Sequence, residues 1–399
     1  MIQKRGSIMR KSIKRKFIAS AVVMSMMLAL AGCGKEEEKP TFTGEVTEEP
    51  AYQTNLDEIT PVAYSEVRDL KLEPGTYISI IGKDEASDFW KNVEKGALQA
   101  GKDLNAELGY TGADKIKVLY NAPAEKEDID EQVNILDEEL ARYPDVVGIA
   151  SIDADSCMVQ FDLALENGIP IVALDSGNTY PGIQCTVKTD NEDAARTVAY
   201  KMADAMGREG QVLMIAHDLK SETGATRSES FRQELAVDYP KVQVAETISL
   251  DEIRETKKKI VAEQNPTMTT EEQRNLVEEM TDEDVVAYYL EKNPEIKGIY
   301  GTNDVSTQLG VRALDQVEEE LAEEIVLMGF DAGKNQMEAL TDGKIDGLVV
   351  QNPFAIGYAS VVAAARTVLH LGNEAVVSTG YTWVTEDNID SESIQKMIY

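Results

Sequence analysis

Short apolar runs alternate with amphipathic stretches along most of the chain from residue 75 onward. The runs are nearly continuous in Ile, Val and Leu, which is typical of strands buried on both faces of a parallel sheet. The first strands are predicted at 77–82, 116–122, 145–151 and 169–175. Helices are predicted between them at 89–109, 127–143 and 156–168. This order indicates βαβ units.

A second set of strands repeats the pattern further along the chain. These strands are predicted at 211–217, 242–248, 296–304, 324–331 and 345–352, again with helices between them. Two successive α/β sets of comparable size predict two similar lobes rather than one large sheet. Residues 251–295 interrupt the second set with three predicted helices, more than an ordinary connection holds. We interpret them as a solvated helical insertion, with partner docking as the alternative.

The N-terminal segment has the features of an export signal. Basic residues precede an apolar run, 17–31, that is short for a membrane span. The sequence Leu30-Ala31-Gly32-Cys33 resembles the lipobox of bacterial lipoproteins, which implies cleavage before Cys33 and lipidation of its thiol. The alternative is an uncleaved anchor in which Cys33 is incidental. We therefore expect a signal peptide over 1–32 and an acidic, disordered tether over 33–72.

Charge and cysteine content exclude several classes of function. The formal net charge of −33 opposes binding to phosphate backbones, so no nucleic-acid partner is expected. Cys157 and Cys185 are too few for a disulfide framework and either pair or stay unpaired. With only His217 and His370, the chain has little material for a zinc site. No metal, cofactor or catalytic motif is expected, and an enzyme is not predicted.

Polar residues gather where the predicted strands end. In parallel α/β sheets, ligands bind outside the carboxyl ends of the strands. The residues at these ends are Asp175, His217, Asn303, Asp304, Asp331, Gln351 and Asn352. A lone histidine such as His217 is as often structural as it is functional. The strand ends therefore predict a ligand cleft.

Six segments, in order, resemble one family. They are "ISIIGKDEASDFWKNVEKGA", "NGIPIVALDS", "TDNEDAARTVAYKMADAMG", "GATRSESFRQEL", "GIYGTND" and "GFDAGKNQMEALTDGKIDGLVVQNPFAIGYASV". Together they resemble the ribose/galactose-type sugar-binding proteins of bacterial ABC importers, which have the class I periplasmic-binding fold. The resemblance covers roughly residues 75–399. It implies two Rossmann-like lobes with parallel sheets, joined by a three-segment hinge that closes on a monosaccharide.

The resemblance also implies lobe boundaries. The chain would cross between the lobes near 188–191, 351–353 and 379–382. The N-terminal lobe would then comprise 73–189 with 352–380. The C-terminal lobe would comprise 190–351 with 381–399.

The same resemblance implies a set of ligand-binding residues whose chemistry suits a neutral sugar. Asp175 and Asp331 would accept hydrogen bonds from hydroxyls, Arg227 would donate, and Asn303 and Gln351 would do both. Some of these residues also have an alternative, purely structural interpretation. Either aspartate could cap a following helix, and Arg227 could form a surface ion pair.

Four further positions carry the aromatic part of the expected site and its main difference from the family. Phe89 and Trp90 match the family's ring-packing aromatic pair, although both could instead be core residues. Ser87 matches a position that carries a sugar-binding Asn in ribose-type proteins. Ser176 stands where those proteins carry an Arg, and this loss of a bidentate donor puts ribose itself in doubt.

The predicted function is capture of a small neutral sugar, a pentose or hexose, and its delivery to ABC permease subunits. We expect a monomer, lipid-anchored to the outer face of the cytoplasmic membrane. Two alternatives keep the fold: a nucleoside or autoinducer-2 as ligand, or a sensor that presents its ligand to a receptor kinase. A repressor of the lactose-repressor type is excluded, because an export signal stands where the DNA-binding segment would be.

Overall fold

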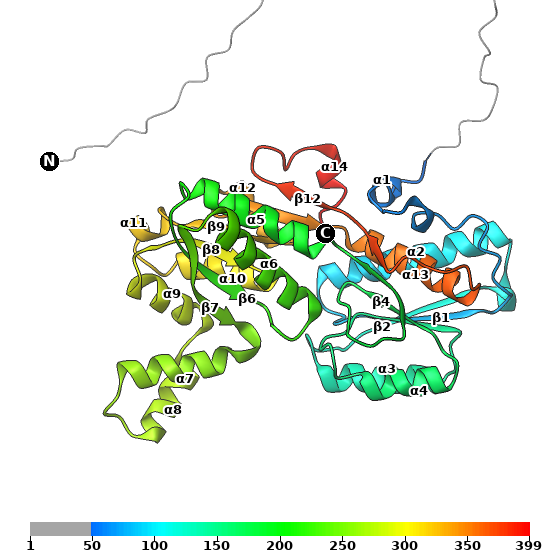
Figure 1. Cartoon of the computed structure of the whole chain (residues 1–399), viewed down its shortest axis with the longest axis horizontal. Helices are drawn as coiled ribbons and strands as arrows, with labels where there is room; N and C mark the ends of the chain where they lie inside the picture. Colours follow the sequence, from blue (N-terminus) through cyan, green and yellow to red (C-terminus); the bar gives the residue numbers. More distant parts are fainter. Residues whose placement is uncertain (1–48) are drawn as a thin grey trace, which may run out of the picture. The chain divides into compact units, whose positions relative to one another are not determined.

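Two six-stranded sheets organise residues 49–399, the part of the chain that the computed structural model describes (Figure 1). In the first sheet the strand order is β11-β5-β4-β3-β1-β2, and every pairing is parallel. The strands are β1 (Tyr77–Ile81), β2 (Lys117–Asn121), β3 (Val146–Ile149), β4 (Ile171–Leu174), β5 (Ile183–Lys188) and β11 (Val376–Ser378).

The second sheet repeats this order as β12-β10-β9-β8-β6-β7, with only the β10–β12 pair antiparallel. Its strands are β6 (Gly210–Ala216), β7 (Val242–Ser249), β8 (Ile296–Gly301), β9 (Val326–Phe330), β10 (Gly347–Gln351) and β12 (Tyr381–Val384). The predicted α/β class with two parallel-dominated sheets is confirmed. The short strands β5, β11 and β12 were not predicted, because their mixed polar sequences lack a continuous apolar run.

Helices cover both faces of the first sheet, which explains why its strands are apolar on both sides. Ile78 and Ile80 of β1 pack on one face into a core shared with α2 and α13, whereas Ile81 packs on the other face with α3 and α4. This alternation follows the two-residue period of a strand. The helices are α2 (Asp88–Leu108), α3 (Ile129–Leu140), α4 (Met158–Glu166) and α13 (Pro353–Val368), with the short 3-10 helix η2 (Gly112–Asp114).

The second sheet is covered in the same way. Val212 and Met214 of β6 pack with α5 and α6, while Leu213 and Ile215 pack with α10 and α12. The helices are α5 (Asn191–Ala205), α6 (Glu222–Asp238), α10 (Asp304–Leu314), α11 (Glu319–Ala322), α12 (Lys334–Thr341) and α14 (Glu392–Gln395).

Residues 49–72 correct the predicted tether. They include α1 (Gln53–Leu56) and the 3-10 helix η1 (Val62–Tyr64), and they are not disordered. Their apolar side chains are buried in the first core, against α13 and its neighbours. These side chains are Leu56, Ile59, Tyr64, Val67, Leu70 and Leu72. The acidic composition of 33–72 hid this apolar series, whose burial stabilises an ordered segment.

The helical insertion contains three helices after the 3-10 helix η3 (Leu250–Glu252). They are α7 (Ile253–Gln264), α8 (Thr270–Glu279) and α9 (Asp282–Lys292). Thr269 and Glu272 form the capping box that starts α8. Figure 1 labels α7 and α8 at one end of the body that carries β6 and β7.

Three further expectations concern cysteines, the membrane and the lobes. Cys157 and Cys185 are both free and buried. In the segment 49–399, no helix is long and apolar enough to cross a bilayer. The signal peptide and Cys33 lie outside the described residues. The lobe boundaries derived from the resemblance stay a prediction, although residues 49–399 form one compact unit.

Candidate functional site

A cavity of about 560 Å³ lies where the carboxyl ends of strands from both sheets meet. All of the predicted ligand-binding residues except Ser176 line it. The lining members are Ser87, Phe89, Trp90, Asp175, Arg227, Asn303, Asp331 and Gln351. Its volume is within the range of small-molecule sites.

The two aspartates hold equivalent places in the two sheets. Asp175 follows β4 and Asp331 follows β9, and both have left-handed backbones with φ of +54° and +83°. Each backbone N–H donates to a strand carbonyl at 2.8 Å, Asp175 to Val187 and Asp331 to Val349. A non-glycine residue in this region is uncommon and points to a functional constraint. Neither aspartate caps the helix that follows it, so that alternative is wrong.

Asp175 is a buried carboxylate at the cavity with unused bonding capacity. It is buried, lines the cavity, and lies 3.9 Å from the Lys83 Nζ, beyond hydrogen-bonding distance. No hydrogen bond to its side chain is formed by residues 49–399. Burial raises the pKa of Asp175 above its ordinary value, against the opposing charges of Lys83 and Arg227. Its oxygens are therefore available to a ligand.

Arg227 is a buried guanidinium held by neutral groups. Its Nε donates to the Asn191 Oδ1 at 2.8 Å, its Nη1 to the Thr302 carbonyl at 2.8 Å, and its Nη2 to the Gln351 Oε1 at 2.9 Å. It forms no ion pair with any carboxylate in the described part of the chain, so the surface-ion-pair alternative is wrong. Since a guanidinium has five N–H groups, two remain for a ligand.

Gln351 and Asn303 are largely committed to the protein. Gln351 Nε2 donates to the Asp331 Oδ1 at 2.6 Å, while its Oε1 accepts from Arg227 and from the Thr189 Oγ1. It thereby couples the guanidinium to the second aspartate. Asn303 caps α10, and its Oδ1 accepts from the backbone N–H of Ser306 at 3.0 Å. Its Nδ2 forms no hydrogen bond within residues 49–399.

Phe89 and Trp90 form an aromatic wall that continues to the last residue. The Phe89 ring lies 5.2 Å from Trp90 and 5.8 Å from Tyr399, edge-to-face in both pairs. Trp90 is also part of the first core, which confirms the core alternative, while contact of this ring with a ligand stays a prediction. Tyr399 belongs to the apolar packing of the second sheet, so this wall joins the two halves.

One turn recurs in both halves and positions the cavity wall. Asp84 Oδ1 accepts from the backbone N–H groups of Ala86 and Ser87 at 2.8 and 2.6 Å. Asp218 repeats these contacts with Lys220 and Ser221 at the same two distances. In each turn the serine is the N-cap of the helix that follows. Ser87 therefore serves as a cap at the cavity edge.

Ser176 is not in the cavity wall, which corrects its predicted role. It is fully buried, and its Oγ accepts from the Lys83 Nζ at 2.7 Å and contacts the Thr223 Oγ1 at 2.8 Å. The left-handed backbone at Asp175 directs its side chain into the cavity. The Ser176 hydroxyl instead contacts Thr223 in the other half of the molecule. Its hydroxyl thus orients Lys83 rather than a ligand.

Several lining residues were missed from the sequence. They include Lys83, Asp84, Lys126, Glu127, Thr223 and Tyr399. Lys83 and Asp84 directly follow the first predicted strand, so the rule that selected Asp175 could also have selected them. Tyr399 carries no local signal, because only the tertiary fold brings it to Phe89.

The comparisons agree with this architecture. A model of the periplasmic binding protein domain matches residues 78–370. The xylitol-binding protein of Mycolicibacterium smegmatis is 22% identical over 283 residues, covering 70% of this chain and 72% of the relative. The D-apiose import binding protein of Actinobacillus succinogenes is 22% identical over 296 residues, covering 73% and 81%.

Solved structures show the same fold. A carbohydrate transporter solute-binding protein from Agrobacterium radiobacter, in complex with D-arabinose, is 25% identical with a TM-score of 0.65. It covers 81% of this chain and 99% of its own. An ABC transporter solute-binding protein from Agrobacterium vitis with bound D-fucose is 24% identical with a TM-score of 0.64, covering 81% and 100%.

Proposed function

Because the chain belongs to the periplasmic binding protein domain family, we propose that it captures a pentose or hexose and delivers it to an ABC permease. Members of this family bind solutes and are not enzymes. The observation that carries the sugar assignment is the meeting of Asp175, Asp331 and Arg227 beside an aromatic wall in one cavity. The relatives named for xylitol, apiose, arabinose and fucose support the same ligand class.

The chemistry of the wall favours a neutral polyol over an anion. A sugar hydroxyl both donates and accepts, so it can donate to Asp175 while accepting from Arg227. Lys83 supplies a second cation beside Asp175, in place of the Arg that Ser176 replaces. The carboxylates of Asp175, Asp304 and Asp331 oppose an anionic ligand. The aromatic faces of Phe89 and Trp90 suit the C–H face of a sugar ring.

Isothermal titration calorimetry tests this function on residues 49–399, which form a compact unit with their own cores. The ligands are ribose, galactose, glucose, xylose, arabinose, autoinducer-2 and adenosine. We expect one sugar to bind with micromolar affinity or better and the others more weakly. Heat only from adenosine or autoinducer-2 would keep the fold and overturn the sugar assignment.

Attachment to the membrane is the second part of the proposal, and it is supported by the lipobox-like sequence that ends at Cys33. In Cys33→Ser the sulfur that would carry the lipid is gone, so labelling of the expressed protein with radioactive palmitate is expected to be lost completely. The matched controls are Cys157→Ser and Cys185→Ser, which change buried thiols and should keep the label. Undiminished labelling of Cys33→Ser would rule out this anchor.

A further inference from the structure

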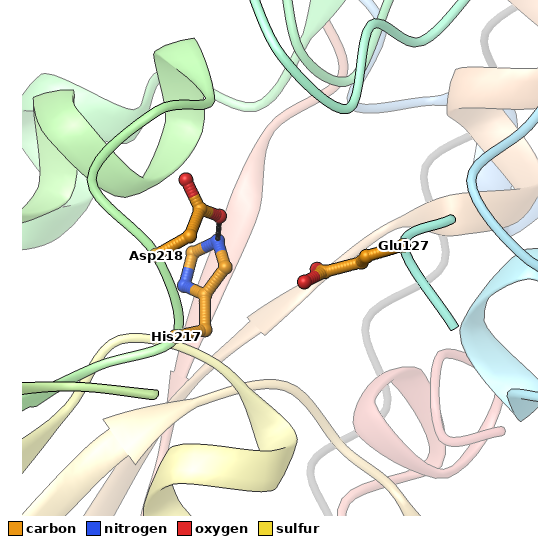
Figure 2. Close-up of side chains that lie close together, drawn as sticks. All are labelled: Glu127, His217 and Asp218. Carbon is orange, nitrogen blue, oxygen red and sulfur yellow. Dashed lines mark ion pairs between the residues drawn. The ribbon is translucent and has the colours of Figure 1, made fainter. Parts of the chain in front are cut away.

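A histidine and two carboxylates converge at the edge of the cavity. Figure 2 shows Glu127, His217 and Asp218, and one possible ligand atom from each lies within 4.8 Å of the others. His217 and Asp218 follow β6 of the second sheet, whereas Glu127 precedes α3, which packs on the first sheet. The cluster therefore joins the two halves of the molecule across the cavity that both line.

Hydrogen bonds to neighbouring residues fix the side chains of His217 and Asp218. The His217 Nδ1 lies 2.7 Å from the Thr302 Oγ1, which fixes the ring and leaves Nε2 toward the cluster. Asp218 Oδ1 accepts two backbone N–H groups, and its Oδ2 accepts from the Ser221 Oγ at 2.9 Å. Hydrogen bonds of this kind orient the ligands of metal sites. Both residues are more than nine-tenths buried.

Asp218 pairs with His217, whereas the Glu127 carboxylate has no ion-pair partner among residues 49–399. Within residues 49–399, neither Glu127 nor Asp218 forms an ion pair with a lysine or arginine. In the described part of the chain, the one ion-pair partner of Asp218 is the His217 imidazole, whose Nε2 lies 2.9 Å from the Asp218 Oδ2. Figure 2 shows that the Asp218 and Glu127 carboxylates meet at this one imidazole.

Glu127 is placed toward this cluster by an unusual backbone. Its φ is +56°, in the left-handed region that non-glycine residues rarely adopt. Figure 2 shows its carboxylate directed at the His217 ring. The neighbouring Lys126 also lines the cavity but forms no ion pair with Glu127.

We propose that Glu127, His217 and Asp218 form a binding site for a divalent transition-metal ion such as Zn²⁺ or Mn²⁺, which links the two halves of the molecule across the cavity. One imidazole nitrogen and two carboxylate oxygens suit such ions, while Mg²⁺ and Ca²⁺ prefer oxygen ligands alone. The neutral imidazole coordinates the ion through the Nε2 lone pair and keeps its one ring proton on Nδ1, directed at the Thr302 Oγ1. Water from the cavity completes the coordination.

The linkage makes the ion a modulator of solute binding. An ion that bridges both halves stabilises the arrangement in which they meet, and a ligand in the cavity contacts both halves in the same arrangement. Ion and sugar then raise one another's affinity by the same factor, as thermodynamic linkage requires. This goes beyond sugar capture, since the ion site uses none of the residues assigned to the sugar.

The test titrates Zn²⁺ into residues 49–399 without sugar, with Mg²⁺ as the comparison ion. We expect one Zn²⁺ per chain, at least tenfold weaker binding in Glu127→Gln, and no comparable Mg²⁺ binding. Glu125→Gln is the matched control, because Glu125 is exposed on the same loop and its substitution removes the same charge. Equal Zn²⁺ binding by both variants would mean adventitious binding to surface carboxylates and would overturn the proposal.

A second measurement separates this site from the sugar site. His217→Gln is expected to lose Zn²⁺ binding, with circular dichroism reporting that the chain remains folded. If no sugar binds but Zn²⁺ binding depends on Glu127 and His217, the ion site stands and the sugar assignment fails. If a sugar binds and Zn²⁺ does not, the ion site fails alone.

Discussion

Asp175→Asn is expected to weaken sugar binding about 100-fold without destabilising the protein. The loss corresponds to about 3 kcal/mol, the order expected when a charged acceptor of two hydrogen bonds is replaced. Stability responds differently, because burial raises the pKa of Asp175 in the folded chain. A carboxyl with a raised folded pKa destabilises the fold when ionised, at pH values above that pKa. Near pH 7, the free energy of unfolding should therefore stay the same or rise.

Calorimetry measures the change in sugar affinity, and urea unfolding measures the change in stability. Glu139→Gln is the control with the opposite expected result, lower stability and unchanged sugar affinity. Glu139 is a buried carboxylate away from the cavity that accepts from the Ser79 Oγ at 2.9 Å and the Asn121 Nδ2 at 2.8 Å. Replacing one of its oxygens by an N–H donor should cost about 2 kcal/mol of stability and leave sugar affinity unchanged. Unchanged sugar affinity in Asp175→Asn would remove Asp175 from the binding site.

Gly357→Val is expected to lower the free energy of unfolding by about 3 kcal/mol or more, through overpacking between two helices. Gly357 lies on α13 where it crosses α2, and a Cβ there would stand 1.9 Å from the Val93 carbonyl oxygen. Gly96 of α2 faces the same crossing, where a Cβ would lie 2.0 Å from the Phe354 carbonyl oxygen. A backbone carbonyl cannot move aside as the end of a flexible side chain can. The two helices would therefore have to move apart.

Thermal and urea unfolding of residues 49–399 measure this loss, with Gly109→Ala as the control on the same helix pair. Gly109 ends α2 with φ of +68°, and a Cβ there meets nothing within 4 Å. Its substitution should cost only about 1 kcal/mol for the left-handed conformation. A similar loss in both variants would mean that close helix contact is not what requires glycine at 357.

Local sequence determined the elements and their ends in this protein. The apolar runs that became β1 to β4 and β6 to β10 are long enough to be recognised without tertiary context. The capping box of α8 is likewise a signal between residues three apart. The same locality explains the error over 49–72, where six apolar side chains are scattered among acidic residues and are recognised as core only beside α13.

Part of the candidate site could be predicted from the sequence for the same reason. Asp175, Asp331 and Gln351 were selected because each ends or follows a strand, and parallel strands bring such residues to one edge. Position along the chain could not show that Ser176 faces away from the cavity while Asp175 faces into it. That division depends on the left-handed backbone at Asp175 and on Lys83 and Thr223, which are distant in sequence.

By itself, then, the sequence determined the α/β class, the two sets of strands and most of the residues at their carboxyl ends. Those features follow from hydrophobic periodicity and short-range hydrogen bonding, which neighbouring residues encode. Only the tertiary structure decided which polar groups are already satisfied and which remain free. Among residues 49–399, the free oxygens of Asp175, the two uncommitted N–H groups of Arg227 and the meeting of Glu127 with His217 all depend on contacts between distant segments.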